Sequence, residues 1–310
     1  MSRLCLPSAD LRDRVHALAP DVELFDDPVL WPDMTRIPDE ATDVVFWVPP
    51  FLHADTASTK AAVTAMPKLQ VIQTQSAGVD VILPAVPAGV QLCDARGVHG
   101  SSTAEWALTA ILSVLREFPR FVRAQANRQW DYTITEELAG KQVLVVGAGD
   151  VGQQLAVRLR ACDVEPVFVA RSARPGVHGL AELPELLPAA DVVVMIVPKT
   201  SETIGMVDAA FLAGMRDGAL LVNAARGPVV DTDALLAELV SGRLRAAVDV
   251  TDPEPLPPEH PLWEAPNLLL TPHVGGSVPG LPNRFARLLV AQVRRFAAGE
   301  PLDNVVSGEY

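Results

Sequence analysis

Three side chains in the second half of the chain combine a cation, a carboxylate and an imidazole: Arg226, Glu254 and His273. A guanidinium group can hold a carboxylate through two parallel hydrogen bonds and polarise a neighbouring carbonyl. An imidazole titrates near neutral pH and can protonate a developing alkoxide. A carboxylate beside the imidazole would orient the ring and favour its protonated form. These three residue types suit the reduction of a 2-oxo acid.

The positions of these three residues along the chain strengthen this interpretation. Each follows a short apolar run that is typical of a buried β-strand. In an open α/β sheet, ligands bind outside the carboxyl ends of the strands. An isolated arginine, glutamate or histidine at such a place is more often structural than catalytic. Their placement after three successive strands favours one shared site.

A glycine-rich segment indicates the cofactor of such a reaction. The apolar run Val143–Val146 leads into a GxGxxG spacing that begins at Gly147, and a helical pattern follows. Glycines at this spacing allow a tight turn, close approach of a pyrophosphate and close helix–strand packing. The first helical N–H groups would face the anion. A glycine turn without a ligand is the alternative. The expected pyrophosphate contacts are Gly147, Gly149, Asp150, Val151 and Gly152.

The end of the next apolar run bears on the choice between NAD and NADP. An NAD site usually has an acidic residue about 20 residues further on, bonded to the ribose 2′-hydroxyl. Here the run ends at Arg171, Ser172 and Arg174, without a carboxylate. Two guanidinium groups and a hydroxyl suit a 2′-phosphate. We therefore expect NADP(H) to be preferred, with NAD(H) possible. The alternative is that the two arginines belong to a solvated loop that binds no phosphate.

Short apolar runs alternate with helical patterns along most of the chain. Most of these runs are continuous, as in strands that are covered on both faces, and the alternation predicts parallel α/β sheets. The expected strands are Arg3–Leu6, Val44–Val48, Val71–Gln73, Val143–Val146, Val167–Val169, Val192–Val197, Ala219–Val222, Ala246–Val248 and Leu268–Leu270. The expected helices are Asp55–Met66, Ser101–Gln125, Val151–Ala161, Thr232–Ser241 and Leu281–Ala298.

The glycine fingerprint lies near the middle of the chain, and the first hundred residues have their own alternation of strand-like runs and helical patterns. We therefore expect a dinucleotide-binding domain, 98–280, inserted into a discontinuous domain formed by 1–97 and 281–310. Two chain crossings would make a hinge, and the cleft between the domains would hold the substrate.

The composition excludes several other classes of protein. The net charge of −13 argues against nucleic acid, which requires a basic face. The cysteines, Cys5, Cys93 and Cys162, are far apart and predict free thiols in a reducing compartment, with no metal site. No signal peptide or membrane-spanning run is visible. We therefore expect a cytoplasmic protein that does not bind membranes.

Several distinctive segments follow one another along the chain, namely Ser76–Asp80, Gly97–Val98 with Ala104–Glu105, the fingerprint, Asn223–Gly227, Asp249–Pro255 and Thr271–Gly276. Taken in this order, these segments resemble those of the D-isomer-specific 2-hydroxyacid dehydrogenase family. The resemblance implies a Rossmann domain inserted into a flavodoxin-like substrate domain, and a homodimer. The Arg-Ser pair at 171–172 is similar to that of the NADPH-using glyoxylate/hydroxypyruvate reductases.

The resemblance also implies roles for single residues. The catalytic trio falls on Arg226, Glu254 and His273, and Arg226 also binds the substrate. The backbone amides of Ala77 and Gly78 would hold the substrate carboxylate, and Asp249 would bind the nicotinamide carboxamide. Further cofactor contacts fall on Val197, Pro198, Ala224, Ala225, His273 and Gly275.

Several alternatives remain open. Some relatives are dinucleotide-sensing corepressors, and the same trio could oxidise another small anion such as phosphite. Formate is disfavoured because formate dehydrogenases carry glutamine at the position of Glu254. Trp47 or His53 could shape the substrate pocket, although Trp47 suits packing better. Trp130 could reach a partner's active site or anchor a dimer. Which 2-oxo acid reacts, and in which direction, stays open.

Overall fold

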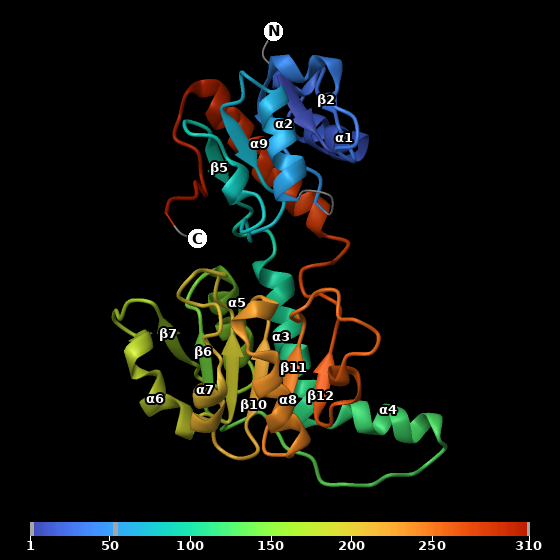
Figure 1. The fold of residues 1–310 in the computed structure, drawn as a ribbon, viewed down its shortest axis with the longest axis vertical. Coiled ribbons are helices and arrows are strands. Elements are labelled where there is room, and N and C mark those ends of the chain that lie inside the picture. Colours follow the sequence, from blue (N-terminus) through green and yellow to red (C-terminus); the bar gives the residue numbers. More distant parts are fainter. Residues whose placement is uncertain (1–2, 52–54, 309–310) are drawn as a thin grey trace. The chain divides into compact units, whose positions relative to one another are not determined.

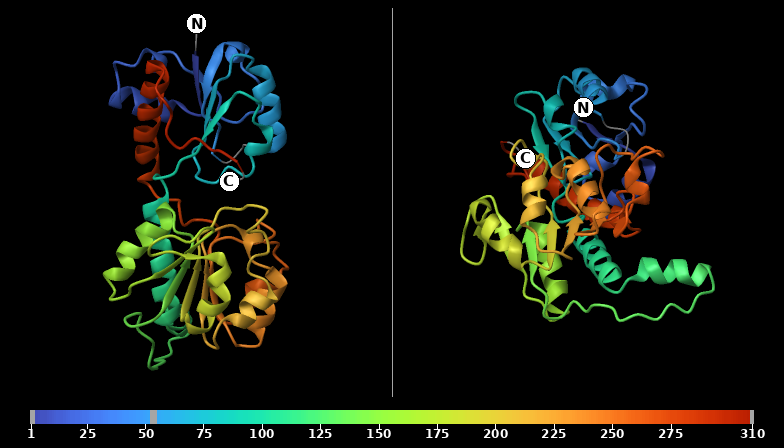
Figure 2. Two further views of the ribbon diagram at one scale, coloured as in Figure 1. Left: turned by 90° about the vertical axis from the view of Figure 1, so that its left-hand side faces the viewer. Right: turned by 60° about the horizontal axis from the view of Figure 1, so that its bottom comes forward.

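The computed structural model describes residues 3–51 and 55–308 of the 310-residue chain, and it divides into two compact units (Figure 1). The first unit consists of residues 1–99 with 279–310, and the second consists of residues 100–278. Within each unit, helices cover both faces of a parallel sheet (Figure 2). This confirms the predicted fold class of two doubly wound α/β domains.

The first unit is built on a five-stranded sheet with the order β2-β1-β3-β4-β5. The strands pair in parallel. Apolar side chains from neighbouring residues of a strand enter different cores, because successive side chains point to opposite faces. Thus Leu4 and Leu6 lie in one core, and Cys5 lies in the other. The strands are β1 (Arg3–Leu6), β2 (Val29–Leu30), β3 (Val44–Trp47), β4 (Val71–Gln73) and β5 (Gln91–Cys93).

Helices from both ends of the chain cover the first sheet. α1 (Ala9–Leu18) packs against α9 (Leu281–Ala298), and both contribute to one core. α2 (Thr56–Ala65) contributes to the other core, in which Trp47 stacks on Trp31. The last long helix therefore belongs to the same unit as the N-terminal strands.

The second unit contains a seven-stranded parallel sheet with the order β12-β11-β10-β9-β6-β7-β8. The chain starts at β6, adds two strands on one side and then four on the other. The order reverses between β6 and β9, which is where doubly wound sheets bind ligands. The strands are β6 (Val143–Val146), β7 (Val167–Ala170), β8 (His178–Gly179), β9 (Val192–Met195), β10 (Leu220–Asn223), β11 (Arg245–Val248) and β12 (Leu268–Leu270).

Two layers of helices enclose the second sheet. One core joins α3 and α5 to one face, and the other joins α6, α7 and α8 to the opposite face. α4 projects from the rest of this unit (Figures 1 and 2). The helices are α3 (Gly100–Leu115), α4 (Phe118–Ala126), α5 (Asp150–Arg160), α6 (Leu183–Leu186), α7 (Ala209–Gly214) and α8 (Thr232–Val240).

The expectation of one helix over Ser101–Gln125 is wrong, because the chain breaks between α3 and α4. Glu117 has a left-handed backbone with φ +53°, and Pro119 follows in the first turn of α4. Proline lacks the N–H group that a position inside a helix needs, but it is tolerated in the first turn, so α3 does not continue and a new helix starts at Phe118. Three short strands were also missed by the apolar pattern, namely β2, β5 and β8.

Candidate active site

The predicted dinucleotide fingerprint forms the turn between β6 and α5. Gly147 has φ +121°, and a Cβ atom there would lie 2.1 Å from the carbonyl oxygen of Ile196. A Cβ atom on Gly152 would lie 2.2 Å from the carbonyl oxygen of Gly147. These two glycines are required by the close approach of the backbone. Gly149, by contrast, has no atom of the described chain within 4 Å of its Cβ position.

Gly149 is the N-cap of α5, and it has no side chain that could cap the helix. The N–H groups of the first helical turn therefore remain available to an anion at the positive end of the helix dipole. The space at Gly149 and these N–H groups fit a bound pyrophosphate. Asp150 and Val151, the other expected contacts, are the first residues of this helix.

The residues that are expected to bind the 2′-phosphate of NADP follow directly after β7. Arg171, Ser172 and Arg174 are all exposed. The main chain of Arg174 pairs with Val177 in a tight turn, through bonds of 2.9 and 2.8 Å. Its Nη2 donates to the carbonyl oxygen of Ala148 at 3.3 Å, within the glycine loop. One guanidinium group thus lies beside the fingerprint, although the two segments are far apart in sequence.

The predicted acid and its carboxylate are in direct contact. The Nδ1 atom of His273 lies 2.6 Å from Oε1 of Glu254. The two residues come from the loops after the neighbouring strands β12 and β11. Their side chains are 47% and 41% exposed, so both are accessible to a ligand. When Nδ1 donates to Glu254, the other ring nitrogen, Nε2, is left to transfer a proton.

This contact also affects the ionisation of Glu254. The hydrogen bond from His273 holds the pKa of the Glu254 carboxyl below its usual range, and the charges of His273 and Arg226 act in the same direction against partial burial. The carboxylate is therefore ionised at neutral pH. Because the pKa of Glu254 is lower in the folded than in the unfolded protein, its ionised form stabilises the fold at pH values above the unfolded-state pKa. This stabilisation is lost as the pH falls through the folded-state pKa.

The Arg226 loop follows β10 and is built on a buried amide. Oδ1 of Asn223 accepts from the N–H of Ala225 at 3.0 Å, and its Nδ2 donates to the carbonyl of Arg226 at 3.2 Å. A Cβ atom on Gly227 would lie 1.8 Å from the carbonyl oxygen of Thr251. Only glycine therefore lets this loop approach the loop that carries Glu254. Arg226 itself is half-buried, and its Nη1 donates to the carbonyl of Ala225 at 2.8 Å.

Asp249 connects the end of β11 to the histidine loop. Its carboxylate, which is 4% exposed, accepts bonds of 2.9 and 2.7 Å from the N–H groups of Val274 and Gly275. It also accepts a bond of 2.6 Å from the hydroxyl of Thr271. Its carbonyl accepts the N–H of His273 at 2.7 Å, where the backbone has φ +54°. Asp249 thus holds the histidine in an uncommon conformation, while the carboxamide contact stays a prediction.

In the first unit, the expected carboxylate loop follows β4. The hydroxyl of Ser76 donates to the carbonyl of Gly78 at 2.7 Å, and the carbonyl of Ser76 accepts the N–H of Ala95 at 3.0 Å. These bonds engage the carbonyl oxygens of the loop. Among the described residues, the N–H groups of Ala77 and Gly78 have no hydrogen-bond acceptor. Both can therefore donate to a substrate carboxylate.

Comparison with known proteins identifies the family. The model of the D-isomer specific 2-hydroxyacid dehydrogenase NAD-binding domain matches residues 108–275. The chain belongs to this family. It is therefore an NAD(P)-dependent oxidoreductase of small 2-oxo and 2-hydroxy acids, as predicted.

Three relatives illustrate the match. A glyoxylate reductase from Thermofilum pendens is 35% identical over 260 residues, which cover 79% of this chain and 77% of the relative. A D-isomer specific 2-hydroxyacid dehydrogenase from Xanthobacter autotrophicus, solved with NADPH and MES, is 30% identical with a TM-score of 0.83 and coverage of 99% and 98%. An NADPH-dependent glyoxylate/hydroxypyruvate reductase from Sinorhizobium meliloti, solved with NADP and sulfate, is 26% identical with a TM-score of 0.82 and coverage of 99% and 98%.

Sequence reasoning assigned no role to two residues that support the site of this dehydrogenase. The indole Nε1 of Trp106, in α3, donates to Oγ1 of Thr271 at 3.0 Å, and Thr271 in turn donates to Asp249. Thr271 lies in a segment that resembles the family, but nothing in the local sequence couples it to a tryptophan so far away along the chain. The remaining cofactor predictions, Val197, Pro198 and Ala224, lie after the neighbouring strands β9 and β10.

The two aromatic candidates for the substrate pocket have different outcomes. Trp47 is fully buried in the core of the first unit, so it packs and does not line a pocket. His53 lies outside the described residues.

The buried Cys5 and Cys93 and the half-buried Cys162 are all free thiols, but a cytoplasmic location stays a prediction. Across the described residues, no cluster of three potential metal ligands occurs, and no helix could span a membrane.

Proposed function

We propose that the dehydrogenase acts as an NADPH-dependent 2-oxo acid reductase with Arg226, Glu254 and His273 as its catalytic residues. The observation that carries this proposal is the 2.6 Å contact between His273 and Glu254, on the loops after β12 and β11. The loop of Arg226 follows the next strand, β10. A general acid, the carboxylate that orients it and a cation for the substrate thus follow three adjacent strands.

The chemistry assigned to these residues is simple. NADPH, when bound, supplies a hydride to the carbonyl carbon of the oxo acid. Arg226 binds the substrate carboxylate together with the amides of Ala77 and Gly78, and it polarises the carbonyl group. As the carbonyl π bond breaks, the oxygen takes the proton from Nε2 of His273. Glu254 stabilises the imidazolium before the transfer and keeps the ring oriented.

The preference for NADPH rests on the basic loop after β7. Arg171 and Ser172 stand where an NAD site usually has an acidic residue, and Arg174 reaches the glycine loop at Ala148. Guanidinium groups bind phosphate through charge-assisted hydrogen bonds. Two similar proteins of known structure were solved with NADPH or NADP. Glyoxylate or hydroxypyruvate is the substrate class that this similarity favours.

Replacing Arg171 and Arg174 with serine is expected to raise KM for NADPH about ten- to a hundredfold, because two charge-assisted contacts to the 2′-phosphate are lost. KM for NADH should change little, since NADH lacks this phosphate. Steady-state kinetics with both cofactors on wild type and variant measure the difference. Arg160→Ser, which removes an exposed arginine paired with Glu165, is the matched control. An equal effect on the two cofactors would reject the assignment.

We also propose a homodimer that uses the arm formed by α4 and residues 127–141. The arm exposes Trp130, Tyr132 and Ile134, with exposed fractions of 97%, 83% and 87%. Large apolar side chains gathered on a projecting segment are typical of an interface.

Light scattering should give about twice the 33.1 kDa of one chain. Trp130→Ser with Ile134→Ser should give monomers, whereas Val157→Ser, on the exposed face of α5, should not. A monomeric wild-type protein would refute this proposal.

A further inference from the structure

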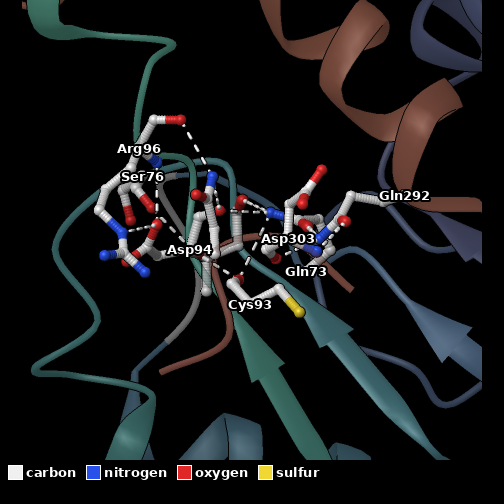
Figure 3. A network of polar contacts seen from close by, with 9 residues as sticks. Gln73, Ser76, Cys93, Asp94, Arg96, Gln292 and Asp303 are labelled. Atoms are coloured by element: carbon white, nitrogen blue, oxygen red, sulfur yellow. Dashed lines mark hydrogen bonds and ion pairs between the residues drawn. The ribbon is translucent and has the colours of Figure 1, made fainter. Parts of the chain in front are cut away.

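A buried polar network lies in the first unit, where the C-terminal segment meets the ends of β4 and β5 (Figure 3). Its centre is Gln292, on the face of α9 that otherwise contributes Phe285, Leu289 and Val293 to the core. Gln292 is fully buried. A polar side chain on such a face has to have its hydrogen bonds satisfied, and it then fixes a single arrangement of its neighbours.

The amide of Gln292 is bonded at both of its ends. Nε2 donates to Oε1 of Gln73 and to the carbonyl of Asp303, each at 2.8 Å. Oε1 accepts the N–H of Asp303 at 2.9 Å. Reversing the amide would place its oxygen against the Asp303 carbonyl, so only one orientation satisfies these groups. The side chain thus joins α9 to β4 and to the C-terminal segment.

Gln73 extends the network toward the predicted carboxylate loop. It is the last residue of β4, and its Nε2 donates to the carbonyls of Thr74 and Asp94 at 3.0 and 2.9 Å. The hydroxyl of Thr74 donates to the carbonyl of Ser76 at 2.8 Å. A continuous chain of hydrogen bonds and backbone therefore leads from Gln292 to the residue before Ala77.

The C-terminal segment closes the network on the other side. Asn304 donates its side-chain amide to the carbonyl of Arg96 at 3.0 Å, and its own carbonyl accepts the N–H of Asp94 at 3.1 Å. The N–H of Val306 donates to the carbonyl of Leu92 at 2.8 Å. Residues 303–306 thus run along β5 and hold the loop after it, whose Ala95 bonds to Ser76.

We propose that Gln292 is a positioning residue for substrate binding: acting through Gln73, it holds the loop Thr74–Gly78 so that its amides meet the substrate carboxylate. This inference rests on the proposed function of Ala77 and Gly78. A loop whose donors are fixed in advance binds an anion without first having to be ordered. Without Gln292, the Gln73 amide loses its fixed orientation, and the carbonyls of Thr74 and Asp94 lose the donor that joins the loop to the segment after β5.

The test compares Gln292→Leu with wild type. KM for glyoxylate is expected to rise about tenfold or more, because a small displacement of a binding loop is costly. kcat should change little, since the carboxylate is bound equally before and during the reaction. KM for NADPH should be unchanged, since the glycine loop belongs to the other unit. Hydrogen exchange of the amides at 74–79 should be faster in the variant.

Two further variants separate positioning from general destabilisation. Val293→Ala weakens the same core beside Gln292 but leaves the network intact, so it should keep the wild-type KM for glyoxylate and the wild-type exchange of the loop. Asn304→Gly removes one amide while tolerating the left-handed backbone at this position, φ +55°, and should raise KM by a smaller factor. Asn304→Gly replaces Gln292→Leu as the test variant if Gln292→Leu does not fold.

The outcomes distinguish this inference from the proposed function. A wild-type protein without turnover of any 2-oxo acid would contradict the proposed function, and loop exchange would still test whether Gln292 orders the loop. An active wild type whose Gln292→Leu variant shows the same KM and loop exchange as Val293→Ala would overturn the inference. The same holds for Asn304→Gly with wild-type KM and exchange if Gln292→Leu is not folded.

Discussion

Replacing His273 with alanine is expected to lower kcat by about two to four orders of magnitude, the usual contribution of a general acid. The variant loses one proposed cofactor contact but keeps the glycine loop, the basic loop and Arg226, so its affinity for NADPH and for the oxo acid should fall much less than kcat. The proton for the alkoxide would then come from water, without an oriented donor. Steady-state kinetics, with NADPH binding measured separately by fluorescence titration, give both quantities.

The control for this variant is His178→Ala. His178 also contacts a glutamate, since its Nδ1 lies 2.6 Å from Oε2 of Glu182, but it lies in β8 at the far edge of the sheet from β12. It should keep wild-type kcat. If His273→Ala retains near-normal turnover, His273 is not the acid.

Replacing Arg226 with lysine is expected to lower kcat/KM about a hundredfold or more, even though the charge is kept. A guanidinium group presents several donors in a fixed plane and can bind a carboxylate at two points, whereas an ammonium is a single point charge. A group that also polarises the carbonyl contributes to the transition state, so kcat should fall with kcat/KM. The measurement is the full dependence of rate on oxo acid concentration.

Arg216→Lys is the matched control for Arg226→Lys. Arg216 pairs with Asp191 on the surface of the same unit, and surface ion pairs contribute little to stability. Its kinetics should equal those of wild type. An Arg226→Lys enzyme with wild-type kcat/KM would show that only a positive charge is needed at position 226. This result would contradict the proposed two-point contact with the substrate carboxylate.

Much of the fold could be predicted from the apolar runs. The central strands are buried on both faces, and their continuous apolar sequences, such as Val143–Val146, define them with exact or nearly exact bounds. β2 and β8 are two-residue edge strands, too short to give a pattern. The break between α3 and α4 depends on a local backbone reversal at Glu117 beside Pro119, which the apolar periodicity does not register.

The candidate site was predictable where it consists of loops directly after strands. The sequence places Arg226, Glu254 and His273 at one edge because the sheet is parallel, but it does not show that the last two touch. The partners that hold the site come from distant segments, such as Trp106 with Thr271 and Gln292 with Gln73. Long-range pairs of this kind leave no periodic signal in a single sequence.

The most direct test of the central claim is to add 2-oxo acids to purified protein with NADPH or NADH and follow the loss of the reduced nicotinamide. The panel should include glyoxylate, hydroxypyruvate and bulkier 2-oxo acids, with phosphite and NADP tested in the reverse direction. We predict NADPH oxidation with at least one small 2-oxo acid, slower with NADH and nearly abolished in His273→Ala. Tight NADPH binding without turnover of any 2-oxo acid would contradict the account and favour a dinucleotide sensor, and turnover of phosphite alone would contradict the substrate class.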